Sequence, residues 1–116
     1  VSLYFGGGNQ TTATDPASTA IGFEVDNATL YGAYYNGTLN KVDLSTTITN
    51  NTNYSFLVWS DGAGNVTWYV DDLAKGTTAT GPTSGSSDAI TLSVTNGADS
   101  FNVRNFLSEI RVFIKP

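Results

Sequence analysis

The chain has 116 residues, a formal net charge of −5, and charged side chains at only 13% of its positions. A chain of this length builds one domain around a single hydrophobic core. Because it contains no Cys, His or Met, it has no means of thiol catalysis, disulfide formation, thiolate zinc binding or histidine-based acid–base chemistry.

The charge balance argues against two further classes of partner. Ten acidic residues outnumber five basic ones, which form no patch that could neutralise several phosphates or anionic lipids. No apolar run approaches the ~20 residues of a membrane span, and no signal-peptide pattern opens the chain. We therefore expect no nucleic-acid partner and no membrane insertion. We also expect the sequence to be either a mature protein or a domain of a longer one.

Apolar and polar residues alternate along most of the chain, which predicts short β-strands and no helix. In chain order, we expect strands over residues 1–5, 21–25, 30–35, 38–43, 45–49, 54–59, 66–70, 73–78, 90–94, 101–106 and 110–115. Turns or loops are expected at residues 9–19, 26–27, 36–37, 50–53, 61–65, 71–72, 81–88 and 96–100. These short strands, with turn signals every ~8–12 residues, favour one antiparallel β-sandwich or barrel domain over residues 1–116.

Two segments carry more specific expectations. Asn36-Gly37 is the strongest hairpin signal, because both residues tolerate a positive φ. Residues 54–59 have large apolar groups on both faces, which predicts a strand in the centre of its sheet.

The alternation of apolar and polar residues also predicts the core. The residues whose spacing places them there are Ile21, Phe23, Val25, Tyr54, Phe56, Val58, Val70, Ile90, Leu92, Val94, Ile110 and Val112.

The stretch from Ser60 to Asp72 admits two interpretations: a loop that holds a metal or substrate, or a plain hairpin turn. A calcium loop needs oxygen ligands at close spacing. Asp61 and Asp71, however, lie at opposite ends of one strand, about 20 Å apart. We therefore predict that Asp61-Gly-Ala-Gly-Asn65 is a turn, opened by the Asp and closed by the Asn, with no metal and no cofactor.

The segment YSFLVWSDGAGNVTWYVDD, residues 54–72, resembles the central hairpin of concanavalin A-like jelly rolls. IGFEVDN and EIRVFI, residues 21–27 and 109–114, also resemble strands of that family, which includes legume lectins, laminin G modules and lectin-like domains of phage and viral structural proteins. The resemblance implies a concanavalin A-like β-sandwich. Asp72 departs from the Gly that is typical there. The family usually begins one or two strands earlier, which would leave an open sheet edge at Val1 to Phe5.

The fold hosts glucanases as well as lectins, so catalysis has to be weighed. Glycoside hydrolysis needs two carboxyl groups facing each other across ~5–10 Å. Glu24 and Glu109 are the only glutamates, and both occupy outward positions of alternating strands. The Glu-X-Asp-X-X-Glu motif of those enzymes is absent. We therefore expect two solvated glutamates, no catalytic residues and no enzymatic activity.

Sugar binding is a stronger possibility, because lectin sites combine aromatic faces with amides and carboxylates. The candidate carbohydrate-binding residues are Tyr34, Tyr35, Asn36, Trp59 and Asp61. The alternative is that the aromatic residues fill the core, which we favour for Trp68 and Tyr54. Tyr34 and Tyr35 point to opposite faces of one strand, so one of them should be exposed.

Asn-X-Ser/Thr triplets occur at Asn9, Asn27, Asn36, Asn50, Asn53 and Asn65. A chain rich in Asn and Thr forms such triplets by chance, so the sites are either unmodified or glycosylated. Glycosylation would make this an extracellular glycoprotein.

The leading hypothesis from the sequence is a structural or adhesive subunit on a virion or cell surface. Such a subunit would form a homo-oligomer or join a larger assembly through the open edge at residues 1–5, where VSLYF is apolar and uncharged. A monomeric carbohydrate-binding module is the alternative, and a glycoside hydrolase is the least favoured.

Overall fold

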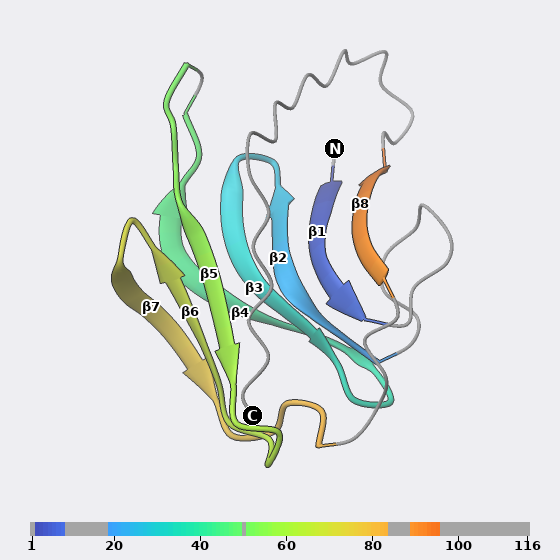
Figure 1. Ribbon diagram of the computed structural model, residues 1–116. Helices are drawn as coiled ribbons and strands as arrows, with labels where there is room; N and C mark the ends of the chain where they lie inside the picture. The colour runs from blue at the N-terminus through green and yellow to red at the C-terminus, as the bar shows by residue number, and fades with distance from the viewer. Residues whose placement is uncertain (1, 9–18, 50, 84–88, 96–116) are drawn as a thin grey trace.

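The computed structural model describes residues 2–8, 19–49, 51–83 and 89–95, and these residues form two antiparallel β-sheets without a helix (Figure 1). The strands are β1 (Ser2–Gly8), β2 (Ala20–Asp26), β3 (Thr29–Tyr35), β4 (Leu39–Thr47), β5 (Phe56–Ser60), β6 (Val66–Val70), β7 (Leu73–Thr78) and β8 (Ala89–Thr95). One sheet has the order β4-β3-β2-β1-β8, and the other has the order β5-β6-β7. The expected all-β class is confirmed.

Strand β1 lies inside the five-stranded sheet. Phe5 is opposite Phe23 of β2 on one side and opposite Leu92 of β8 on the other. The expected open edge at residues 1–5 is therefore wrong for the described residues 2–5. The reason is a pairing between β1 and β8, which are about 90 residues apart in the chain, and no local pattern reveals such a partner.

Strand β5 also differs from expectation. It pairs only with β6 among the described strands, whereas β6 is paired on both sides. Within the part of the chain that the structure describes, β5 is therefore an outer strand, whereas a central strand was predicted over residues 54–59. The large groups on its second face, Leu57 and Trp59, are exposed rather than buried.

Two hairpins are closed by two-residue turns in which both residues have a positive φ. Asn27 and Ala28 have φ of 47° and 71°, and Asp71 and Asp72 have φ of 50° and 65°. Turns of this kind match the twist of antiparallel strands. The break predicted at residues 71–72 is confirmed, and the turn predicted at residues 26–27 lies one residue later.

Strand β4 joins two segments that were expected to be separate. It covers most of the predicted strand at residues 38–43 and the first three residues of the one at 45–49, and its pairing with β3 shifts register between Leu30 and Tyr31. Ser45 has a φ of 50° at this irregularity, where its backbone N–H donates to the Asp43 carboxylate. The bulge keeps one strand continuous across the expected gap.

The two sheets share one hydrophobic core. Its buried members are Phe23, Leu30, Tyr34, Leu44, Val66, Trp68 and Val70, which come from both sheets. Trp68 is fully buried, and its indole ring lies against Gly32, where any β-carbon would overlap the ring. The expectation that Trp68 belongs to the core is confirmed.

The predicted core residues divide into three groups. Phe23 and Val70 are buried, while Ile21, Val25, Tyr54 and Val58 are partly buried against the core. Phe56 is 36% exposed although its ring contacts Phe5 and Phe23, so the prediction that it is a buried core residue is wrong. Its strand is an outer strand of the described three-stranded sheet. The side chains of Ile90, Leu92, Val94, Ile110 and Val112 lie outside the described part of the structure.

Other predicted elements also fall outside the described residues: most of the loop at 9–19, the strands at 101–106 and 110–115, and the turn at 96–100. The described part of the chain contains no helix with the length and apolar character that a membrane crossing requires.

Candidate functional site

Three connections meet at one end of the molecule, near the bottom of Figure 1. They are residues 36–38 between β3 and β4, residues 61–65 between β5 and β6, and residues 79–83 after β7. The Gly81 N–H donates to the Gly64 carbonyl oxygen at 2.8 Å, and the Asn36 side-chain amide donates to the Thr80 carbonyl oxygen. Residues 79–83 therefore connect the two hairpin turns, which belong to different sheets.

The first connection confirms the hairpin predicted at Asn36-Gly37, although it contains three residues rather than two. Gly37 has a φ of 114° and open space around it. The side chain of Asn40 donates to the Asn36 side-chain oxygen at 3.0 Å. Both ends of the Asn36 amide are thus held, which fixes the orientation of this exposed side chain.

The second connection is organised by the Asp61 carboxylate. It accepts hydrogen bonds from the Ala63 N–H at 2.7 Å, the Asn65 N–H at 3.1 Å and the Asn65 side-chain amide at 2.5 Å. The Asn65 side chain, followed by the Ala63 backbone N–H, lowers the pKa of Asp61 below its ordinary value, because these donors favour the charged form. Gly62 and Gly64 adopt φ of 74° and 98°. The turn predicted at Asp61-Gly-Ala-Gly-Asn65 is therefore confirmed.

The carboxylates in the stretch from Ser60 to Asp72 do not converge. At the far end of β6, the Asp71 carboxylate accepts a hydrogen bond from the Ser55 N–H at 2.8 Å, which ties the residue before β5 to the turn between β6 and β7. Within the residues that the structure describes, no three carboxylates group together as metal ligands would.

A cluster of hydroxyl groups supports the third connection from inside. The Tyr34 hydroxyl is 2.7 Å from the Thr80 hydroxyl. The Thr78 hydroxyl donates to the Tyr34 hydroxyl at 3.3 Å. Tyr34 itself is only 6% exposed, with its ring centroid 6.0 Å from that of Trp68. Its ring is therefore part of the core and is not available to stack on a sugar.

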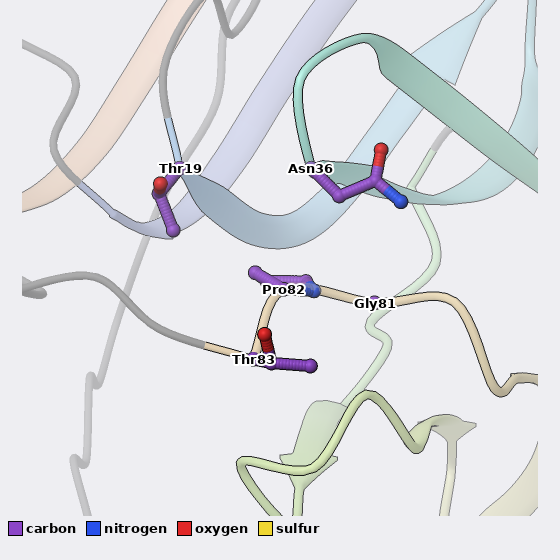
Figure 2. Close-up of a pocket in the computed structure, with 5 residues that line it drawn as sticks. All are labelled: Thr19, Asn36, Gly81, Pro82 and Thr83. Atoms are coloured by element: carbon purple, nitrogen blue, oxygen red, sulfur yellow. The ribbon is translucent and has the colours of Figure 1, made fainter.

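A pocket of about 340 Å³ opens between these connections. Figure 2 shows Thr19 and Asn36 on one side and Gly81, Pro82 and Thr83 on the other. Its lining offers an amide, two hydroxyl groups and a proline ring, and none of these groups is charged. The volume lies at the small end of the range of ligand pockets, about 300–1,000 Å³.

The pocket wall is closely packed at Gly81. This residue is buried, and a β-carbon at its position would overlap the Val66 side chain and lie 3.0 Å from the Gly64 carbonyl oxygen. Because only glycine fits there, residues 79–83 can lie directly on the hairpin of β5 and β6.

The structure therefore separates the predicted sugar-binding residues. Asn36 lines the pocket, and Asp61 shapes a turn that contacts its wall. Tyr35 is half-buried on the other face of its sheet, against Ala20 and Ala33. Trp59 is 48% exposed on the outer face of the three-stranded sheet.

Sequence reasoning missed Thr19, Pro82 and Thr83 as pocket residues. The run GPTSGSS predicts a loop, but no local signal shows that this loop faces Asn36, because the approach depends on how the two sheets pack.

The expectation that Glu24 is solvated is wrong. Glu24 is fully buried, and its carboxylate is 2.5 Å from the Lys41 ammonium group. The Lys41 nitrogen also lies 5.8 Å from the centre of the Tyr31 ring. Glu24 belongs to β2, the middle strand of the five-stranded sheet, and the ion pair with Lys41 compensates its burial. Glu109 lies outside the described residues.

Four asparagines of the Asn-X-Ser/Thr triplets are exposed: Asn27, Asn36, Asn53 and Asn65. The side-chain nitrogens of Asn36 and Asn65 donate hydrogen bonds within their turns. Asn27 and Asn53 are thus the more accessible pair. Asn9 and Asn50 are not among the described residues.

Comparisons of the chain with protein-family models, with curated proteins and with solved structures found no match.

Proposed function

We propose that this protein is a non-enzymatic structural or adhesive subunit on the surface of a virion or cell, and that it contacts glycans through the pocket around Asn36. The observation that supports this best is the lining of that pocket. An amide with a fixed orientation and two hydroxyl groups complement the hydroxyl groups of a sugar, and the Pro82 ring offers an apolar contact. The absence of charge among these five residues favours a neutral ligand.

The fold that we propose is a concanavalin A-like jelly-roll sandwich. Two antiparallel sheets share a core that joins Phe23 and Leu30 of one sheet to Trp68 of the other, as a sandwich requires. The turn of the β5–β6 hairpin, with its carboxylate and two glycines of positive φ, is consistent with the family pattern seen in the sequence.

Glycoside hydrolysis fits the structure less well. A general acid in such an enzyme is a carboxyl group that reaches the substrate. Glu24, one of the only two glutamates, is instead fully buried and ion-paired with Lys41. Its position suits a structural role better than proton donation to a sugar.

Assembly into a homo-oligomer or a larger surface structure remains part of the proposal, but it cannot use residues 2–5, which β2 and β8 cover on both sides. The support is compositional: charged side chains occupy only 13% of the positions, so a contact between the edges of two copies has to bury few charged groups. Among the described strands, β4 is an outer strand of one sheet and β7 of the other. We propose these as the contact edges.

A glycan array tests the pocket, with Asn36→Ala and Thr83→Ala as variants and Asn53→Ala as the matched control. Asn53 is an exposed asparagine outside the pocket. We expect binding of at least one neutral glycan that both pocket variants weaken at least tenfold and the control leaves unchanged. No binding, or equal binding by all variants, would contradict the glycan contact.

Sedimentation at high concentration separates the two forms of the proposal. Oligomers favour the surface subunit, while a monomer that binds glycans would make the protein a carbohydrate-binding lectin-like module, which is the alternative. The exposed, hydrogen-bonded Asn36 supports that alternative equally well.

A further inference from the structure

The outer face of the β5-β6-β7 sheet exposes a row of large apolar side chains. Leu57 is 51% exposed and Trp59 is 48% exposed, and both alternate with Val58, which packs against the core. Exposed apolar groups that lie next to one another, rather than singly, are typical of interaction sites. This face is distinct from the pocket, because none of its residues lines it.

Strand pairing shows what surrounds these two side chains. Leu57 is opposite Tyr69, and Trp59 is opposite Thr67, which is in turn opposite Thr77. We call these five residues the aromatic face. Since neighbouring strands are ~4.8 Å apart, the row from Trp59 through Thr67 to Thr77 is about 10 Å long. It places two hydroxyl groups in line with one indole ring.

Charge narrows the choice of ligand. Across the three strands Lys75 is the one charged residue, while carboxylates lie at both ends of the strands, at Asp61 on one side and at Asp71 and Asp72 on the other. Two copies stacked through this face would bring these carboxylates of like charge together, on chains that each carry a net charge of −5. An anionic polymer would be repelled in the same way. A neutral, hydroxylated ligand avoids both kinds of electrostatic repulsion.

We propose that the aromatic face binds a neutral polysaccharide chain that lies across the three strands. The apolar C–H faces of successive sugar rings stack on Trp59 and on the exposed part of Tyr69, because the face of an aromatic ring carries partial negative charge. The hydroxyl groups of Thr67 and Thr77 exchange hydrogen bonds with the sugar hydroxyls. This surface extends the proposed function from a pocket for one sugar to a platform for several units of a chain.

The two tryptophans make the proposal measurable. Trp68 is fully buried and Trp59 is exposed, so acrylamide quenches the fluorescence of Trp59 selectively. The test titrates the full chain with laminarin, galactomannan and hydroxyethylcellulose, and with alginate as an anionic control. We expect at least one neutral polymer to lower the quenching constant of Trp59 at least twofold, and alginate to leave it unchanged.

Variants assign the effect to the aromatic face. Retardation on native gels that contain the same polymers should be lost in Trp59→Ala and largely kept in Trp59→Phe, which retains a flat ring. Leu73→Ala is the matched control, because Leu73 is a 61% exposed apolar residue outside the aromatic face. Near-ultraviolet circular dichroism of the buried Trp68 reports whether each variant is folded.

The proposal is overturned if no neutral polymer protects Trp59, if alginate alone does so, or if folded Trp59→Ala is retarded as strongly as the unmodified protein. It is also overturned if Trp59→Ala converts a sedimenting dimer into a monomer, since a second copy would then occupy the face. The Asn36→Ala variant distinguishes the pocket from the aromatic face. It should weaken glycan binding in the pocket and leave the retardation by polymers unchanged.

Discussion

The indole N–H of Trp68 in β6 donates a hydrogen bond to the carbonyl oxygen of Gly22 in β2, with 2.6 Å between the two atoms. The bond joins residues 46 positions apart and links the two sheets within a fully buried environment. On the same side of the core, the indole ring covers Gly32 so closely that no β-carbon fits. Trp68 thus joins the two sheets through both its N–H group and the face of its ring.

This arrangement predicts that Gly32→Ala is destabilising. The added methyl group has to displace the Trp68 ring, and with it the hydrogen bond to Gly22, so we expect a loss of about 1–3 kcal/mol. Urea denaturation measures the free energy of unfolding. Gly37→Ala separates overlap from backbone effects, because Gly37 has open space around it but a positive φ. An unchanged stability of Gly32→Ala would show that the ring does not lie where the structure has it.

Phe23 and Phe56 provide a second prediction, because their rings touch but their burial differs. Phe23 is 3% exposed and Phe56 is 36% exposed. Phe23→Ala should cost the ~3–5 kcal/mol typical of a buried aromatic residue. Phe56→Ala should cost clearly less, since part of its ring already contacts water. Equal losses in thermal or urea unfolding would mean that Phe56 is covered in solution.

The turn at Asp61 predicts a pH dependence. Hydrogen bonds from Asn65 and Ala63 lower the pKa of Asp61 in the folded protein below its ordinary value of 3.8. A carboxylate with a lowered pKa adds stability above that ordinary value and loses it as the pH falls through the lowered pKa. Asp61→Asn imitates the protonated form, so it should unfold more easily than the unmodified protein at neutral pH.

The difference between the two proteins should shrink as the pH falls below 3.8. Melting temperatures of both proteins, measured from neutral pH to pH about 2.5, check this. Because Asp61 is exposed, salt should also reduce the difference. A gap that stays constant with pH would mean that the charge of Asp61 is not what stabilises the turn.

Chelation is the fourth prediction. The Asp61 carboxylate accepts from Ala63 at one end of β6 and the Asp71 carboxylate accepts from Ser55 at the other end, so we expect EDTA to leave the melting temperature unchanged. A ligand that binds only the folded state raises the apparent stability. A fall of several degrees on chelation would therefore reveal a bound ion, and addition of Ca²⁺ or Mg²⁺ should then restore the original value.

Local sequence was sufficient where the interaction is local. Asp61-Gly-Ala-Gly-Asn65 forms a turn because its carboxylate reaches N–H groups two and four residues ahead. Asp71-Asp72 closes a hairpin because short polar residues tolerate a positive φ. Alternation along β6 buries Val66, Trp68 and Val70, because β6 has a partner on each side and the core beneath one face.

Tertiary structure decided everything that depends on distant partners. Strand β1 is interior rather than an edge because β8 pairs with it. Glu24 is buried because it lies in the middle of a sheet beside Lys41, not because of its own neighbours in the chain. The pocket joins Thr19, Asn36 and Pro82, which come together only when residues 79–83 connect two hairpins of different sheets. The alternation of a strand determines which side chains share a face, but the pairing and stacking of sheets determine whether that face meets water, a core or a ligand.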